Sequence, residues 1–210
     1  MTDLLPANSL VRKIWITETD AYRDHLLRLD AESRRLRFGG GVSDAFIQKY
    51  VKLASTLDAV LYGYYVDGVL RGVAELRAVR DKTDVDAEAA FSIEREWQSH
   101  GVGSALMSQM LLAARNRGIR TLHMICLADN QRMQQLAKKF DAQFSFEYGS
   151  VIGEVETPYP TPVSVMREVV ADSANFATAM LDVHKRLFKF PLPRLRAEGD
   201  TEQAQTAAIK

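Results

Sequence analysis

The sequence of 210 residues has one cysteine, no net charge and no long apolar run. Because Cys126 has no second thiol to pair with, the chain can form neither an intramolecular disulfide nor a cluster of thiolates around a metal. Its 27 basic and 27 acidic residues cancel, which argues against nucleic acid as a partner and against a polybasic membrane contact. Any anionic ligand must therefore be held by a local site and not by the overall charge.

Signals for membrane insertion, export and metal binding are also missing. No stretch of about 18 consecutive apolar residues occurs, and the opening residues MTDLLPANSL lack the charged region and apolar run of a secretory signal. No group of His, Asp and Glu has the spacing of metal ligands. We therefore expect a cytoplasmic protein without a membrane contact or a metal.

The periodicity of apolar residues predicts a mixed α/β domain. In chain order the patterns predict a strand, two helices, three antiparallel strands, a helix, a strand, a helix and two strands, at residues 11–17, 17–29, 44–53, 59–65, 69–79, 86–93, 104–117, 120–127, 130–140, 143–148 and 151–155. Asp67-Gly68 and Gly149-Ser150 lie between strand pairs and predict hairpin turns. Ser43 and Asp44 are good caps for the second helix.

Three prolines, Pro158, Pro160 and Pro162, mark a boundary after this domain. The stretch from Val163 to Phe188 carries an apolar stripe that predicts a long helix. The last residues, 197–210, are polar, and we expect them to be disordered. The sequence thus predicts a domain at 10–157, a helical extension at 158–196 and a tail at 197–210.

The stretch EWQSHGVGSAL, residues 96–106, joins a predicted strand to a predicted helix. A Gly-x-Gly turn at this place directs backbone N–H groups and the positive end of the helix dipole at one point, which suits an anion. Gly101 and Gly103 lack the third glycine of a dinucleotide fingerprint and the Gly-Lys-Ser/Thr of a nucleotide triphosphate loop. On these two glycines alone, a plain turn and a phosphate site are equally supported.

The surroundings of the glycines resemble a known family. The run from Gln98 to Gly103 is similar to the Gln/Arg-x-x-Gly-x-Gly/Ala loop of the GNAT N-acetyltransferase superfamily, and 87–93 (AEAAFSI) resembles its central strand. Downstream, 104–107 resembles the start of its cofactor-binding helix, and Asn130 falls where the family places an Asn. The resemblance covers about residues 10–157. In its motifs it is nearest to the bacterial protein-lysine acetyltransferase-like subset.

The resemblance implies a fold and a cofactor. The fold is the GNAT fold, an α/β (α+β) arrangement with a mixed sheet of about seven strands, a splayed parallel pair and about four flanking helices, here with a C-terminal helical extension. The cofactor is acetyl-CoA, acting as co-substrate. The implied cofactor-binding residues are Phe91, Ser92, Ile93, Gln98, Ser99, His100, Gly101, Val102, Gly103, Ser104 and Asn130. His100 is a departure, since the family often has Arg, Lys or Gly there.

The resemblance also implies transfer of an acetyl group to a primary amine within a ternary complex. Many relatives use a Tyr as the acid for the departing thiolate, but that position is Ala137 here. Glu88 is the candidate general base, because strand alternation puts Asp86, Glu88 and Ala90 on one face. The alternative for Glu88 is a salt bridge at the end of the sheet. If the missing Tyr means lost activity, the protein is instead a catalytically silent acyl-CoA-binding regulatory module.

The sequence carries fewer signals for the acceptor and for the remaining reactive side chains. The acceptor amine could belong to a protein lysine or to a small molecule. The run from Ser33 to Phe38 resembles the acceptor border of protein-lysine acetyltransferases, but its arginines could equally be a solvated helix end. We expect Cys126 to be a buried structural thiol, His123 to be a packing residue, and His25 and His184 to have surface or helix-packing roles. The helix beyond Pro162 could cover the acceptor cleft or form a homodimer contact.

Overall fold

The computed structural model describes residues 5–6, 8–54, 59–79 and 86–188. Seven strands and six helices follow one another in the order β1 (Ser9–Lys13), α1 (Thr19–Arg28), α2 (Ala31–Phe38), α3 (Asp44–Ala54), β2 (Ala59–Val66), β3 (Val69–Ala78), β4 (Asp86–Ile93), α4 (Val102–Asn116), β5 (Thr121–Leu127), α5 (Gln131–Lys138), β6 (Gln143–Glu147), β7 (Ser150–Glu156) and α6 (Pro162–Phe188). Short 3₁₀ turns, η1 (Ile16–Glu18) and η2 (Arg95–Trp97), precede α1 and the loop before α4. The predicted tail at 197–210 lies outside the described residues.

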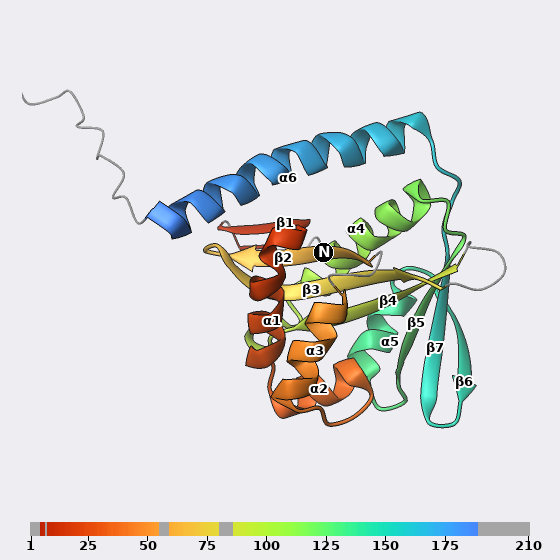
Figure 1. Ribbon diagram of the computed structural model, residues 1–210. Helices are drawn as coiled ribbons and strands as arrows, with labels where there is room; N and C mark the ends of the chain where they lie inside the picture. The colour runs from red at the N-terminus through yellow and green to blue at the C-terminus, as the bar shows by residue number, and fades with distance from the viewer. Residues whose placement is uncertain (1–4, 7, 55–58, 80–85, 189–210) are drawn as a thin grey trace, which may run out of the picture.

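The strands form one mixed sheet in the order β1-β2-β3-β4-β5-β7-β6 (Figure 1). All neighbouring pairs are antiparallel except β4 and β5, which are parallel. Their register joins only three residues of each strand, Asp86–Glu88 with Thr121–His123. Beyond Glu88 the two strands separate, so the splayed parallel pair implied by the resemblance is confirmed.

Helices cover both faces of the sheet and form two cores (Figure 1). On one face α4 and α5 bury an apolar cluster that includes Leu106, Met110 and Leu122. On the other face α1 and α3 bury a second cluster that includes Tyr22, Leu26 and Ile47. Burial of this apolar surface on both sides is the main favourable contribution to folding.

The first predicted helix, at 17–29, corresponds to α1, but a separate helix that was not predicted, α2, follows it. Leu29 has extended backbone (φ −59°, ψ 134°), and the carboxylate of Asp30 then accepts hydrogen bonds from the backbone N–H groups of Glu32 and Ser33, so that α2 starts as a separate helix. Gly39 ends α2 in the left-handed conformation with φ 73°. As a result five helices flank the sheet, where about four were expected.

The predicted turns and boundaries differ from the structure by a few residues. Asp67 and Gly68 both have positive φ (50° and 75°), as a two-residue hairpin turn requires. The second turn lies at Tyr148-Gly149, one residue earlier than predicted. The first strand ends at Lys13 and not at Thr17, because the chain turns into the 3₁₀ segment at Ile16.

The predicted C-terminal helix is confirmed as α6, which runs across the top of the view in Figure 1. It contacts α4 and β1. Buried Glu168 accepts hydrogen bonds from Asn116 (2.6 Å) and Arg117 (2.8 Å) of the α4 end. About one turn beyond Glu168 on α6, Asp172 pairs with Lys13 (3.0 Å). These polar contacts hold α6 in one position against the domain.

Candidate functional site

Strand β4 presents different residues to its two sides, as the alternation predicted. Ala87 and Ala89 are buried in the core beneath α4, and Phe91 packs against that core. Glu88 and Ala90 point to the opposite side of the sheet, where they line a cavity. The carboxylate of Glu88 is exposed, and no hydrogen bond or ion pair joins it to any residue that the structure describes. Among the described residues, Glu88 therefore lacks the salt bridge considered as its alternative role.

The loop between β4 and α4 forms a compact turn with two residues in the left-handed region. Ser99 has φ 63° and Gly101 has φ 78°. Gly101 is the N-cap of α4, and Ala105 is the first residue whose N–H bonds back to it (3.0 Å). The N–H groups of residues 102–104 consequently point out of the helix end, where the dipole favours an anion. The sequence did not indicate the strained conformation of Ser99.

The second glycine of the loop serves close packing. A Cβ added at Gly103 would lie 3.3 Å from the side chain of Leu136 in α5 and 3.7 Å from Ile93. Gly103 thus lets α5 approach the end of α4. Asn130 caps α5, since its side chain accepts a hydrogen bond from the N–H of Met133 (3.1 Å), and this role matches the prediction that Asn130 opens the helix.

Gln98 fixes the loop to its neighbours. Its amide nitrogen donates to the carbonyl oxygen of Ile93 (2.9 Å) and to Ser33 Oγ (3.3 Å), while its amide oxygen accepts from Arg132 (2.9 Å). Gln98 therefore joins the end of β4, helix α2 and helix α5. His100 is exposed, and its Nδ1 donates to the carbonyl oxygen of Gln98 (2.7 Å), which points the rest of the imidazole toward solvent.

These elements enclose a cavity of about 310 Å³, which we call the loop cavity. Nine of the eleven predicted cofactor-binding residues line it, namely Phe91, Ser92, Ile93, Gln98, Ser99, Gly101, Gly103, Ser104 and Asn130. His100 and Val102 are not part of the lining. The side chain of Val102 is buried in the core, so only its backbone N–H is available. Helices α2 and α5 complete the walls.

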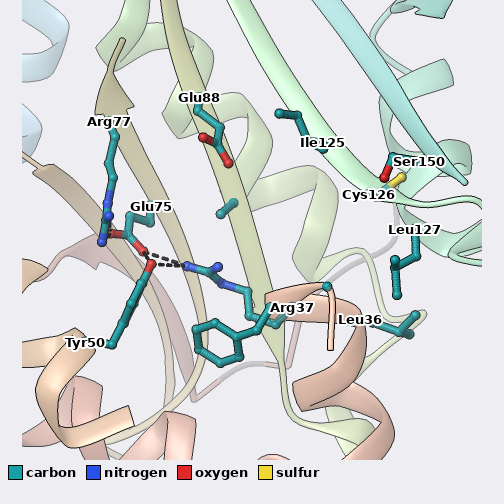
Figure 2. A pocket seen from close by; sticks show the side chains of 13 residues that line it. Leu36, Arg37, Tyr50, Glu75, Arg77, Glu88, Ile125, Cys126, Leu127 and Ser150 are labelled. Carbon is teal, nitrogen blue, oxygen red and sulfur yellow. Dashed lines mark hydrogen bonds and ion pairs between the residues drawn. The ribbon is translucent and has the colours of Figure 1, made fainter. Parts of the chain in front are cut away.

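A second cavity of similar volume, about 310 Å³, lies beside Glu88, and we call it the Glu88 cavity (Figure 2). Its polar lining includes Arg37 from α2, Tyr50 from α3, and Glu75 and Arg77 from β3. Leu36 and Arg37 line both cavities. The loop cavity and the Glu88 cavity therefore adjoin at these two residues.

Glu75 is the carboxylate that sequence reasoning missed. Its side chain is only 1% exposed. One oxygen accepts hydrogen bonds from Tyr22 (2.9 Å), Tyr50 (2.7 Å) and Arg37 (2.6 Å), and the other oxygen accepts from Arg77 Nε (2.6 Å). The only sequence signal was an acidic residue inside the otherwise apolar run VAEL of this strand.

The partners of Glu75 determine its ionisation. Burial alone would raise the pKa of Glu75, but the charges of Arg37 and Arg77 and the hydrogen bonds from Tyr50 and Tyr22 outweigh burial and lower it. Burial also raises the pKa of Tyr50, so its hydroxyl stays protonated and donates to Glu75. Glu75 is therefore a permanently charged, fully bonded carboxylate that cannot take up a proton readily.

His25 lies behind the loop cavity, fully buried, which corrects the expectation of a surface role and agrees with a helix-packing role. Its Nδ1 is 3.2 Å from Glu94 Oε1 and its Nε2 is 2.9 Å from Ser92 Oγ. Burial lowers the pKa of His25, although Glu94 acts in the opposite direction. In the neutral ring Nδ1–H donates to Glu94 and Nε2 accepts from the Ser92 hydroxyl, so helix α1 is bonded to β4 at Ser92.

The remaining predicted residues have structural surroundings. Cys126 is buried, and burial raises the pKa of its thiol, in agreement with the expected structural role. His123 lies 3.4 Å from Glu154 and 3.8 Å from Asp86 at the sheet surface, so it is not a pure packing residue. Ala137 is buried in the core and has no hydroxyl to donate. The side chain of His184 lies outside the described residues.

The described part of the chain lacks two further kinds of feature. Among the residues with assigned positions, no group of three or more His, Cys, Asp or Glu side chains could hold a metal ion. Within the same ranges, no helix has the length and apolar content needed to cross a membrane.

Comparisons with known proteins give a family. The sequence profile of the acetyltransferase (GNAT) family matches residues 24–142, more than half of the chain. Over 88 residues the chain is 31% identical to the acetyltransferase Pat of Mycolicibacterium smegmatis, a match that covers 41% of this chain and 26% of that protein. The chain thus matches only about a quarter of the length of this curated relative.

Solved structures share the fold. The GNAT domain of S. lividans PAT has a TM-score of 0.62 at 23% identity, covering 70% of this chain and 90% of that one. A putative acetyltransferase from Salmonella typhimurium, solved with its cofactor acetyl-CoA, has a TM-score of 0.55 at 14% identity, covering 73% of this chain and 96% of that one. An N-acetyltransferase from Thermoplasma acidophilum, solved with coenzyme A, has a TM-score of 0.54 at 17% identity, covering 70% of this chain and 98% of that one.

Proposed function

The chain belongs to the acetyltransferase (GNAT) family, and from this premise we propose that it transfers an acetyl group from acetyl-CoA to a primary amine. The transfer takes place directly, in a ternary complex of the protein, acetyl-CoA and the amine. We assign this activity to residues 10–157, with 158–196 as an extension, and to the cytoplasm. The amine belongs to a protein lysine or to a small molecule.

The loop cavity is the proposed seat of acetyl-CoA. Two relatives with the same fold are described with acetyl-CoA or coenzyme A. In this chain the outward N–H groups of residues 102–104 and the end of the α4 dipole would bind the pyrophosphate. The separation of β4 from β5 beyond Glu88 leaves backbone groups of residues 91–93 for the pantetheine arm. The thioester then lies near the junction of the two cavities.

The observation that carries the assignment of the base is the contrast between the two carboxylates of the Glu88 cavity. Glu75 is saturated by hydrogen bonds from two arginines and two tyrosines. Glu88 faces the same cavity without a partner in the described part of the chain. Only Glu88 is therefore free to accept the proton that the amine must lose before or during attack.

The reaction uses these groups in a simple order. The amine nitrogen attacks the thioester carbonyl carbon, Glu88 takes its proton directly or through a water molecule, and the carbon–sulfur bond then breaks. The products are an amide and coenzyme A. Because Ala137 offers no hydroxyl, the thiolate leaves as the anion or takes a proton from water.

A second candidate function follows from Ala137. A protein that binds acetyl-CoA without a general acid for the thiolate could be a silent acyl-CoA-binding module that regulates a partner. The two functions differ in turnover, because the module binds acetyl-CoA but releases no coenzyme A.

Coenzyme A release with a panel of primary amines separates the two functions. We expect turnover by the wild type, and a loss of about 10²–10⁴ in kcat for Glu88→Gln with acetyl-CoA affinity unchanged. Binding without release for every amine would favour the silent module. Release that is unaffected by Glu88→Gln would remove Glu88 as the base and leave the transferase activity standing.

A further inference from the structure

Arg37 has hydrogen-bonding capacity that the fold does not use. Its side chain is only 8% exposed. Nη2 donates to Glu75 (2.6 Å) and to Tyr50 (2.8 Å). Within the described residues no partner meets Nε or Nη1 of Arg37. Because Arg37 lines both cavities, a ligand in either of them can accept hydrogen bonds from these N–H groups in place of water.

The wall that contains Arg37 carries excess positive charge. Arg37 and Arg77 supply two guanidinium groups, whereas Glu75 between them supplies a single carboxylate. One positive charge therefore remains next to the Glu88 cavity. Apolar side chains such as Leu36 and Ile125 also line this cavity.

The opposite charge lies on the neighbouring strand. In the register of β3 and β4, Glu75 is opposite Ala90, and Arg77 is opposite Glu88, which lies two residues before Ala90 on β4. At about 3.3 Å per residue, the backbone of Glu88 is about 7 Å along the strand from the level of Glu75. Figure 2 shows Glu88 and Arg37 reaching into the same space, Glu88 from β4 and Arg37 from α2. Glu88 thus supplies a negative charge to this cavity and Arg37 a positive charge, from different elements.

From this arrangement we propose that the acceptor is an amine that also carries a carboxylate, with the amine at Glu88 and the carboxylate on Nε and Nη1 of Arg37. This inference rests on the proposed function. The carboxylate is that of a free ω-amino acid or of an acidic residue beside a lysine in a polypeptide. Arg37 is then a specificity-determining residue for the acetyl transfer.

In its ground state the cofactor can offer Arg37 neutral carbonyl oxygens at the junction of the cavities, but no negative charge. The charged part of acetyl-CoA is its phosphates, which the proposed function places at the N-terminus of α4. The pantetheine arm and thioester that reach the junction of the cavities are uncharged. The one competing partner is the oxyanion that forms on the thioester carbon during attack, and it would make Arg37 important for every amine alike.

The test uses pairs of amines that differ only in charge. Coenzyme A release is measured for a series of ω-amino acids against their carboxamides, and for a lysine peptide with a neighbouring Glu against the same peptide with Gln. We expect kcat/KM to favour the carboxylate by about tenfold or more in at least one kind of pair. The kind of pair that shows the preference identifies the source of the carboxylate.

Arg37→Gln is expected to abolish the preference, because kcat/KM should fall about tenfold more for the carboxylate than for its carboxamide. Arg37→Lys keeps a positive charge beside Glu75 and serves as the conservative variant, with part of the preference retained. Arg35→Gln is the matched control, because Arg35 lies on the same helix and pairs with Glu32 and Asp129 at the surface. We expect no change in preference for Arg35→Gln.

Several results would overturn the inference, and they are distinguishable. Turnover by the wild type with equal kcat/KM for the two members of every pair removes the carboxylate requirement and leaves the proposed function intact, even if the Arg37 variants fail to fold. An equal loss for both members in Arg37→Gln assigns Arg37 to the oxyanion. Absence of coenzyme A release with every amine overturns the proposed function and the inference with it.

Discussion

The loop cavity and the Glu88 cavity share Leu36 and Arg37, but different kinds of groups line the rest of each cavity. The loop cavity consists largely of backbone, glycine and helix ends within one continuous stretch, residues 91–104, closed by α5 and α2. The polar wall of the Glu88 cavity consists of long side chains from α2, α3 and β3 that meet at Glu75, to which Tyr22 of α1 also donates a hydrogen bond. A backbone site suits a ligand common to a whole family, whereas a side-chain site can change with the acceptor.

The largest effect that we expect is a loss of stability when the side-chain wall of the Glu88 cavity is disrupted by Glu75→Gln. Without the carboxylate, the guanidinium groups of Arg37 and Arg77 lose the negative charge between them, and Arg37 is nearly buried. The free energy of unfolding should therefore fall by about 3 kcal/mol. Urea denaturation followed by circular dichroism measures this loss. In the control Glu32→Gln, the surface partner of Arg35 is removed, and we expect no measurable change. An unchanged urea midpoint for Glu75→Gln would show that the wall does not depend on this ion cluster.

A smaller effect is expected from Gly103→Val in the loop cavity. The new side chain would press on Leu136 (3.3 Å from the added Cβ) and Ile93 (3.7 Å) at the lining of the cavity. Overpacking of this kind should weaken acetyl-CoA binding by about tenfold or more, as measured by isothermal titration calorimetry. Gly40→Val is the control, because an added Cβ there meets no atom within 4 Å. Normal acetyl-CoA affinity in Gly103→Val would remove the proposed seat of the cofactor.

The smallest effect concerns pH and His25, behind the loop cavity. Its pKa is lowered in the folded state by burial, so the unfolded chain binds more protons below the ordinary pKa of about 6.5. Stability should therefore be complete above that pH and decrease as the pH falls toward the folded-state pKa, by at most about 1.4 kcal/mol per pH unit. Urea midpoints between pH 7.5 and 5.5 measure the slope.

The variant His25→Gln tests the assignment of this slope. Its side chain cannot titrate, so the decrease over the same range should become shallower than in the wild type. Glu94, Arg28, Arg71 and Ser92 face His25 or its partner Glu94. The carboxylate of Glu94 has a lowered pKa and titrates at lower pH. An identical slope in the variant would assign the effect to another group.

The sequence predicted the loop cavity better than the Glu88 cavity for a physical reason. The phosphate-type loop depends on local features, namely the spacing of Gly101 and Gly103 and the strand and helix on either side. Strand alternation likewise placed Glu88 and Ala90 on one face, as their shared cavity confirms. Local periodicity and turn chemistry are available in a single sequence, and most element boundaries followed from them.

Contacts between distant segments could not be predicted in the same way. Glu75 meets Tyr22, Arg37 and Tyr50 across 53, 38 and 25 residues of sequence, and nothing in the spacing of these residues indicates that they meet. His25 and Ser92 are separated by 67 residues. The unpredicted helix α2 did have a local signal, because Asp30 is a good cap, but the stretch after it carries few apolar residues.

Helix α6 has a consequence for the behaviour of the protein in concentrated solution. A sheet that ends in an unpaired strand can recruit strands from other molecules and aggregate. At one end of this sheet α6 contacts β1, held by Glu168 and Asp172. At the other end β6 is exposed along all five residues. Truncation before Pro162 would therefore leave both ends of the sheet open to self-association, and colloidal stability would fall even if the rest of the fold stayed intact.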